Sequence, residues 1–290
     1  MSLLEVKGLC KQYREFHLED ITFDLPKGYI MGYIGQNGAG KTTTINMITS
    51  LCKCDMGEVK VNGITYEENP IAYKESIGYI GDESYFPKEF KIKDVKRILK
   101  QFFPSFHEET FEAYISKWNL SEKKKIGEYS RGMKVKLMFA SILSRETKLL
   151  ILDEATNGLD PVMREEILSI LQDYIEDGEK SILFSTHVLN DLEQIADYIV
   201  FIDNGKILFQ EAKDELVEHY LLIKGEAKDM KAGLENKLIG KTNGKYGFEA
   251  IIEADAAMEF GNHFVYDKPS IDQIMLYFIK NGREKAYAGN

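Results

Sequence analysis

The sequence predicts an α/β protein in which helices flank a central, mostly parallel sheet. Three observations predict this fold class. Residues 29–34 form an apolar run that leads into a glycine-rich loop and then into a helical pattern. Residues 149–152 form a second continuous apolar run, as expected of a strand buried on both faces. From residue 130 onward, short apolar runs alternate with helical patterns, which is typical of strand–helix–strand units.

Length and composition exclude several classes of protein. The 290 residues suit one large domain or two modest ones, and a hydrophobic content of 44% is ample for a core. A net charge of −10 argues against a protein dedicated to nucleic-acid binding. No apolar run approaches the roughly 18 residues of a spanning helix, and no secretion signal is visible. We therefore expect a cytosolic chain with reduced cysteines, for which any membrane role requires a partner.

The N-terminal part predicts antiparallel strands near residues 3–11 and 18–24. Tyr13 lies between them, and an aromatic ring ahead of the glycine-rich loop can stack on a purine, although a surface turn is the simpler interpretation of this residue alone. Asn62-Gly63 predicts a two-residue hairpin turn, and residues 76–80 predict another short strand.

A phosphate-binding loop is predicted by the stretch Gly35-Gln36-Asn37-Gly38-Ala39-Gly40-Lys41-Thr42-Thr43, which matches G-x-x-x-x-G-K-[ST]. The glycines leave backbone N–H groups free to turn toward a phosphate. Lys41 supplies a positive charge for the β- and γ-phosphates, and the Thr42 hydroxyl can ligate Mg²⁺. A strand before the loop and a helix after it would aim a helix N-terminus at the anion. The chain is therefore predicted to bind a nucleoside triphosphate.

Residues 84–145 predict a helical subdomain, whose first part is rich in aromatic residues. Most of these rings are expected to pack internally, and some could face a partner. Ser130, Arg131 and Gly132 then precede a helix, and the serine, the glycine and the free N–H groups could form a second phosphate site. In a head-to-tail pair, each such helix end could close on the nucleotide of the other copy. The simpler alternative is an ordinary helix capped by serine.

An acidic pair, Asp153-Glu154, ends the apolar strand at residues 149–152. Hydrolysis of a triphosphate needs one carboxylate that holds the metal and one that orients or deprotonates the attacking water. We assign the metal to Asp153 and the water to Glu154.

A histidine, His187, lies just after the strand predicted at residues 181–185. The carboxyl ends of parallel strands line the ligand crevice, so this side chain could hydrogen-bond the γ-phosphate. A structural role is the alternative for a lone histidine. Asp160 and Pro161 are suited to the N-cap and first position of a helix.

The pattern changes after residue 218, which predicts a first domain of residues 1–218 and a small α+β domain of residues 219–290. The first predicted elements are a strand near 219–224, a possible helix at 228–237, and a turn at Asn243-Gly244 between two strands. A strand near 264–266 and a helix at 271–280 follow. This helix begins with a Ser270/Gln273 capping box, and the tail after residue 284 is expected to be frayed. The domain is expected to regulate or stabilise a dimer, or to act as a brace.

The ordered motifs resemble those of the ATP-binding cassette (ABC) family over roughly residues 3–212. These motifs are the phosphate-binding loop, the Ser-x-Gly helix start, Leu-Leu-Ile-Leu-Asp-Glu, Gly158-Leu159-Asp160 and Ser-Thr-His. The resemblance implies a P-loop NTPase core of the ABC ATPase type with an N-terminal antiparallel β subdomain and a helical subdomain. It also implies that Tyr13 stacks on adenine, that Ser130 and Gly132 reach the γ-phosphate in trans, and that Asp160 lies at the dimer seam.

Two positions depart from the family pattern. The usual Leu-Ser-Gly-Gly-Gln is Tyr-Ser-Arg-Gly-Met here, with Arg131 in place of the first glycine. The glutamine that usually follows the Gly-Tyr-Ile strand, and that contacts Mg²⁺ or water and the membrane subunit, is Asp82. Asp82 thus joins Thr42 and Asp153 as a predicted metal ligand. Both departures are similar to cassettes of bacterial ABC-2-type exporters, including those for peptides and lantibiotics.

The resemblance implies a subunit that binds and hydrolyses ATP with Mg²⁺, with Lys41, Glu154 and His187 as catalytic residues. It would power export through a separate transmembrane permease at the cytoplasmic face of the membrane. A second ATP-binding subunit, identical or different, would complete the assembly, and nucleic acid would play no part. The alternative is a soluble, non-transport ABC ATPase in macromolecular assembly.

Overall fold

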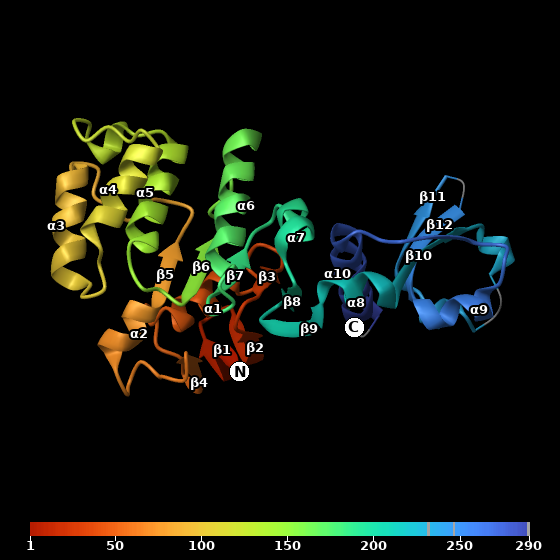
Figure 1. Ribbon diagram of the computed structural model, residues 1–290. Coiled ribbons are helices and arrows are strands. Elements are labelled where there is room, and N and C mark those ends of the chain that lie inside the picture. Colours follow the sequence, from red (N-terminus) through yellow and green to blue (C-terminus); the bar gives the residue numbers. More distant parts are fainter. Residues whose placement is uncertain (231–232, 246, 289–290) are drawn as a thin grey trace. The chain divides into compact units, whose positions relative to one another are not determined.

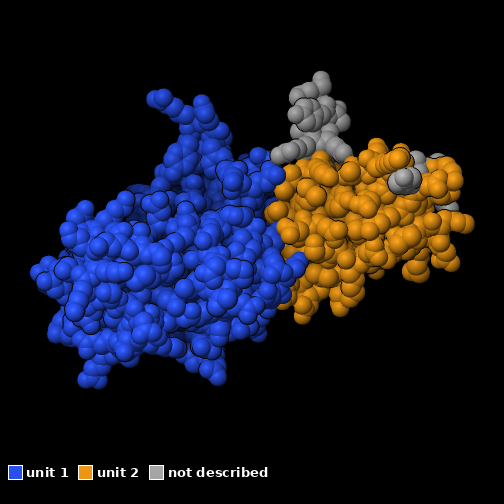
Figure 2. Space-filling model, turned by 90° about the horizontal axis from the view of Figure 1, so that it is seen from above, with its two compact units in different colours: residues 1–210 blue, residues 211–290 orange. Residues whose placement is uncertain are grey.

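The chain forms two compact units in a computed structural model that describes residues 1–230, 233–245 and 247–288. Figure 2 colours the units, which comprise residues 1–210 and 211–290. The sequence placed this boundary after residue 218. Helix α8 (Lys213–His219) groups instead with the second unit, because it packs against the strand β10 (Tyr220–Gly225) that follows it.

The first unit is built on a six-stranded sheet with the strand order β5-β6-β7-β3-β8-β9. These strands are β3 (Ile30–Ile34), β5 (Ile77–Ile80), β6 (Leu149–Asp153), β7 (Ser181–Ser185), β8 (Tyr198–Asp203) and β9 (Lys206–Ala212). The pairs β5–β6, β6–β7, β7–β3 and β3–β8 are parallel. Every residue of β3, β6 and β7 is buried, as the continuous apolar runs predicted.

A three-stranded antiparallel sheet with the order β2-β1-β4 lies in the same unit. It consists of β1 (Ser2–Gln12), β2 (His17–Pro26) and β4 (Met56–Val61), so the two predicted N-terminal strands are confirmed. One cluster of buried side chains, which includes Leu9, Phe23 and Tyr33, joins this sheet to the central one. The turn at Asn62-Gly63 forms with both residues at positive φ, but only a single bridge to Ile64 follows it.

The helices of the first unit flank the central sheet or form a lobe beside β5 (Figure 1). They are α1 (Lys41–Ile48), α2 (Pro70–Ser76), α3 (Ile92–Phe102), α4 (Glu108–Lys117), the short 3-10 turn η1 (Ile126–Glu128), α5 (Arg131–Leu143), α6 (Pro161–Ile175) and α7 (Leu189–Ile195). Phe86, Phe111 and Trp118 of the lobe are buried, so their predicted internal packing is confirmed, whereas Phe102 is exposed.

Helix α5 packs closely on the edge strand β5. A Cβ added to Gly78 would lie only 2.5 Å from Cγ2 of Ile142, which leaves no room for a larger residue. This contact fixes the C-terminal half of α5 on the sheet, whereas Ser130 caps the opposite end of the helix.

The second unit contains a four-stranded antiparallel sheet with the order β11-β12-β10-β13. Its remaining elements are β11 (Ile239–Gly244), β12 (Gly247–Glu253), β13 (Val265–Asp267), α9 (Ala257–Phe260), α10 (Ile271–Ala288) and the 3-10 turns η2 (Ala227–Asp229), η3 (Glu235–Lys237) and η4 (Ala254–Ala256). Ile223, Phe248, Phe260 and Phe264 form the centre of its own apolar core.

The helix predicted at residues 228–237 is wrong. The described residues of this stretch contain short 3-10 turns, and Gly233 has a φ of +89°, which an α-helix does not accommodate. The turn predicted at Asn243-Gly244 is also displaced, because both residues belong to β11 and Gly244 already pairs with Gly247.

The predicted capping box at the start of α10 is confirmed. The Ser270 N–H donates to Gln273 Oε1 (3.0 Å), and the Gln273 N–H donates to Ser270 Oγ (3.2 Å). Helix α10 extends to Ala288, beyond its predicted end, and residues 289–290 lie outside the described residues. The predicted free cysteines are also confirmed. Within the described ranges, no helix has both the length and the apolar character needed to cross a bilayer.

Replacing Phe260 by Ala should destabilise the second unit by about 3–5 kcal/mol, because a fully buried ring is lost from its core. Hydrogen exchange of the β12 amides measures this loss in the full chain. Met258→Ala is the matched control on the same helix, since Met258 is 90% exposed, and it should change stability by less than about 0.5 kcal/mol. Equal protection of the β12 amides in the two variants would contradict the inference that the Phe260 ring stabilises the second unit.

Candidate functional site

The glycine-rich loop connects β3 to α1 and requires glycine at two positions. A Cβ on Gly35 would lie 2.3 Å from the carbonyl oxygen of Ile202, and Gly40 has a φ of +116° immediately before α1. Asn37, Gly38 and Thr42 are exposed, and Ala39 is buried beneath them. The start of α1 is therefore open to an anion, as the phosphate-binding motif predicts.

The ammonium group of Lys41 is buried in this loop, and its side chain is only 6% exposed. It donates hydrogen bonds to the carbonyl oxygens of Gly35 (2.7 Å) and Gln36 (3.2 Å), and its Nζ lies 4.0 Å from Glu154 Oε1. Burial lowers the pKa of Lys41, and the charges of Glu154 and Asp153 oppose this shift. Neutral carbonyls leave the cation incompletely compensated, which suits the binding of a phosphate.

Asp153, the last residue of β6, is buried and has an unsatisfied oxygen. Its Oδ1 has no hydrogen-bond partner among the described residues. Burial raises the pKa of this carboxyl group, and the nearby hydroxyls of Thr42 and Ser185 partly oppose the shift. Ser185 is the partner of Asp153 in the register between β6 and β7. A buried oxygen without a partner, beside hydroxyl groups, fits a hard cation such as Mg²⁺.

The carboxylate of Glu154 is held by hydrogen bonds from two directions. Its Oε2 accepts from the Asn157 side-chain amide (2.9 Å) and the His187 N–H (3.2 Å), and lies 2.8 Å from His187 Nδ1. The Glu154 N–H donates to the Ser185 carbonyl (2.8 Å). Glu154 also has a φ of +58°, a conformation that costs a non-glycine residue of order 1–3 kcal/mol.

The order of the strands explains why these side chains meet. Strands β6, β7 and β3 are neighbours, so the segments after them leave the same edge of the sheet. Glu154 follows β6, His187 follows β7 and Lys41 follows β3, and the contacts described above join Glu154 to the other two. Sequence reasoning missed Asn157, although its spacing of three residues from Glu154 in the following loop was a usable signal.

The other predicted phosphate site lies at the start of α5. Ser130 is exposed and caps the helix, with its Oγ accepting from the Met133 N–H (3.3 Å). A Cβ on Gly132 would lie 2.9 Å from Cε of Met163, in the first turn of α6. Asp160 caps α6 and accepts from the Met163 N–H (3.0 Å), so the starts of α5 and α6 adjoin. None of these contacts involves Lys41 or Glu154.

Tyr13 lies in a turn next to the phosphate-binding loop. Its N–H donates to the Phe16 carbonyl (2.8 Å), and a Cβ on Gly40 would lie 3.1 Å from Cζ of Phe16. The Tyr13 ring is 44% exposed and therefore accessible for stacking. Its role in binding a base stays a prediction.

The two residues that depart from the family pattern contact each other. The guanidinium of Arg131 donates to Oδ1 of Asp82 and forms an ion pair with it. Sequence reasoning identified both departures but did not pair them. The metal-ligand role predicted for Asp82 stays a prediction, and it competes with this ion pair for the same oxygen.

Comparison with known proteins identifies the family. The ABC transporter family profile matches residues 18–157. The chain is 31% identical to the bacitracin transport ATP-binding protein BcrA of Enterococcus faecalis over 97% of this chain and 89% of the relative. It is 32% identical to the lantibiotic transport ATP-binding protein SrtF of Streptococcus pyogenes, over 73% of this chain and 92% of that protein. The chain belongs to the ABC transporter family.

A solved structure described as the ATP-binding subunit of an ABC transporter supports the same assignment. It has a TM-score of 0.68 and 30% identity to this ABC protein, over 74% of this chain and 92% of the other. The predicted P-loop ABC ATPase fold is thus confirmed. This ABC protein is an ATP-binding subunit of the transporter type, and it is an ATPase. The alternative of a non-transport ATPase in macromolecular assembly is not favoured.

Asp153→Asn should stabilise the nucleotide-free ABC protein at neutral pH by about 0.5–2 kcal/mol, because it removes a buried, unsatisfied charge. The raised pKa fixes the sign of the pH dependence. The folded state binds the proton more tightly than the unfolded chain, so wild-type stability falls as pH rises from the ordinary value of 3.8 through the raised one. The gain should therefore vanish near pH 4 and below.

Thermal unfolding of the nucleotide-free variant across this pH range measures the effect. Asp160→Asn is the control, because Asp160 is exposed and asparagine is an equally good helix cap. A loss of stability at neutral pH in Asp153→Asn would contradict the inference that the buried charge of Asp153 destabilises the nucleotide-free protein.

Proposed function

We propose that two copies of this ABC subunit bind ATP between them, each contributing half of the pocket. One observation carries this proposal: Lys41, Glu154 and His187 form a connected cluster at one end of the sheet, while the exposed Ser130 and the half-buried Gly132 lie at the start of α5, without contact to that cluster. A helix N-terminus with a serine cap is suited to a phosphate. In a head-to-tail pair, that end would complete the cluster of the other copy, with Asp160 at the seam.

Within each pocket, Thr42 and Asp153 would hold Mg²⁺, because the unsatisfied Oδ1 of Asp153 and a nearby hydroxyl provide the oxygen donors that this ion prefers. The ion would neutralise charge on the β- and γ-phosphates. Lys41 would contact the same phosphates. Tyr13 would stack on adenine, and its exposed ring is accessible for this role.

Glu154 would orient the attacking water and accept its proton. The hydrogen bonds from Asn157 and His187 hold the carboxylate in one orientation, which is what a general base requires. His187 is exposed enough to contact the γ-phosphate of a bound nucleotide. Loss of the γ-phosphate would then remove a group that both copies bind, and the pair would separate, since ATP favours closure only through its greater affinity for the closed state.

Glu154→Gln should lower ATP hydrolysis by at least about a hundredfold, because the amide cannot accept the proton of the water. Binding of ATP and association of two copies should persist, since Lys41 and Ser130 are unchanged. Steady-state hydrolysis and light scattering with ATP measure the two properties. Glu146→Gln, at an exposed glutamate, is the control and should keep full activity. Turnover near the wild-type rate in Glu154→Gln would show that another group is the base.

We further propose that the subunit powers export of a peptide or another amphipathic cargo through a separate permease at the cytoplasmic face of the membrane. The relatives BcrA and SrtF are described as bacitracin and lantibiotic transport proteins, which supports this class of cargo. The second ATP-binding subunit can be an identical copy, because Lys41, Ser130, Glu154 and His187 are all present in this chain.

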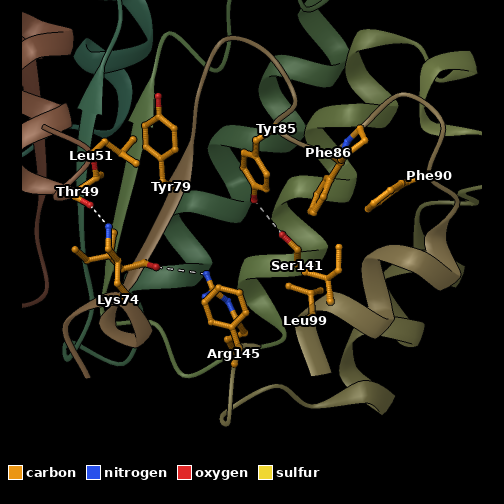
Figure 3. Close-up of a pocket in the computed structure, with 14 residues that line it drawn as sticks. Thr49, Leu51, Lys74, Tyr79, Tyr85, Phe86, Phe90, Leu99, Ser141 and Arg145 are labelled. Carbon is orange, nitrogen blue, oxygen red and sulfur yellow. Dashed lines mark hydrogen bonds between the residues drawn. The ribbon is translucent and has the colours of Figure 1, made fainter. Parts of the chain in front are cut away.

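An apolar cavity of about 460 Å³ beside the helical lobe is the proposed docking site for the permease. In Figure 3, Tyr85, Phe86 and Phe90 lie around one part of the cavity and Arg145 around another. The Arg145 guanidinium stacks on Phe103 at 3.8 Å from the ring centroid. Aromatic side chains of this kind suit the apolar face of a helix from the membrane subunit.

The charge of this cavity favours an acidic group on the incoming segment. Nε and Nη1 of Arg145 are buried and have no hydrogen-bond partner among the described residues, and Nη2 donates to the Ile77 carbonyl (3.4 Å). None of the described lining residues is acidic. Burial lowers the pKa of the guanidinium, although it stays charged. A carboxylate on an apolar permease helix would pair with the guanidinium and accept from one of its free N–H groups.

Tyr85→Asp should abolish co-purification of the permease from detergent extracts, because a carboxylate replaces an aromatic wall of the docking cavity. Tyr29→Asp is the matched control, since Tyr29 is 41% exposed, comparable with 49% for Tyr85, and lies outside this cavity. The measurement is the amount of one identified integral membrane protein that accompanies each variant. Equal recovery with both variants would refute this docking site.

A further inference from the structure

We propose that the Asp82–Arg131 ion pair positions the phosphate-binding end of α5. The pair would hold Ser130 and Gly132 in the place where they meet the nucleotide of the second copy. The inference rests on the two-copy arrangement proposed above, because the position of this helix end matters to ATP only there. Arg131 is a positioning residue in this account and does not itself contact the phosphate.

Helix α5 is fixed on the central sheet through its C-terminal half, while its first half adjoins α6 at Gly132 and through the Lys136–Glu166 ion pair. Its C-terminal half packs on β5 through the close contact between Ile142 and Gly78, and Ser141 Oγ lies 3.2 Å from the Tyr85 hydroxyl. The helix has 13 residues and therefore spans about 20 Å. A small change of its angle on the sheet would move the Ser130 end by several times the displacement at the anchored end.

Asp82 is well placed to fix the other end. It lies close after the end of β5, at the start of the segment of residues 81–91 that leads to α3. The later part of this segment is bound through its backbone, because Phe90 and Lys88 accept hydrogen bonds from the N–H groups of Ile126 and Gly127 (2.8 Å each) in η1. The ion pair adds a contact from the sheet end of the segment to the first residue of α5.

The charges at the start of α5 need a negative partner. The first turn contains Arg131 and no acidic residue, and a cation is unfavourable there because the helix dipole is positive at this end. Asp82 supplies the compensating charge. Both residues line a cavity of about 240 Å³ together with Glu83 and Lys134.

The side chain of Arg131 also lies beside the loop that follows Glu154. A Cβ on Gly158 would lie 3.7 Å from Cδ of Arg131, and Nε of Arg131 is buried without a hydrogen-bond partner among the described residues. Gly158 belongs to the loop between Glu154 and α6 and has a φ of +63°. Arg131 thus contacts the segment after β5 through Asp82 and lies beside the loop after the predicted base, and its backbone begins α5.

The test is a double-mutant cycle in the full chain with Asp82→Asn, Arg131→Gln and the two combined. Each single variant should raise the ATP concentration for half-maximal hydrolysis about two- to fivefold, with less than a twofold change in kcat. This factor corresponds to the free energy that a partly exposed ion pair contributes. The double variant should be no worse than either single variant, and Arg131→Lys should stay within about twofold of wild type. Lys136→Gln, which breaks the α5–α6 ion pair with Glu166, is the matched control and should have no effect.

Two results would overturn the inference. If Asp82→Asn has no effect while Arg131→Gln does, Arg131 acts on the phosphate directly and not through the pair. If the two effects multiply in the double variant, the residues act independently.

Hydrogen exchange without nucleotide separates this inference from the two-copy proposal. The Met133 amide, in the first turn of α5, should exchange faster in both single variants. Unchanged exchange in a protein that still dimerises with ATP would refute the positioning pair. Faster exchange in the variants, together with a wild-type chain that never dimerises with ATP, would refute the two-copy arrangement and leave the pair standing.

Discussion

The buried ammonium of Lys41 is the constraint on which the site depends. It is held by neutral carbonyl oxygens at the end of β3, and its nearest carboxylate oxygen, on Glu154, is 4.0 Å away. Burial of a cation with incomplete compensation is unfavourable, as the lowered pKa of Lys41 reflects. The glycines allow the loop to fold around the ammonium group, and the strand order brings the loop and the ends of β6 and β7 to one edge of the sheet. A triphosphate would supply the missing negative charge.

Other groups at the same edge are also held in unfavourable states. Asp153 has a buried oxygen without a partner, and Glu154 has a positive φ. These costs fall within a few residues of each other, next to strands whose residues are all buried. The packed strands therefore fix groups that would relax if they were free. We infer that this ABC subunit gives up some stability in the nucleotide-free state in order to present a ready binding site.

The central sheet and the site motifs could be predicted because their signals are local. Buried parallel strands are continuous apolar runs, and the loop, Asp153-Glu154 and His187 each follow such a run. The second unit was harder. Residues 228–237 contain good helix formers, but Gly233 adopts a left-handed conformation, and Asn243 pairs with Phe248 within the sheet instead of forming the turn. In the second case the strand pairing outweighs a local turn preference, whereas the first reflects the glycine inside the predicted helix.

The Asp82–Arg131 pair could not be predicted from local sequence patterns, because the two residues are far apart in the sequence. Their opposite charges explain why they pair. An aspartate in place of a glutamine adds a negative charge, and an arginine in place of a glycine adds a positive one at a helix N-terminus. Arg131 without Asp82 would place an uncompensated cation against the helix dipole. Asp82 without Arg131 would place an unpaired acid in the segment after β5. The two departures from the family pattern therefore contact each other, and the charge of Asp82 compensates the one that Arg131 adds at the start of α5.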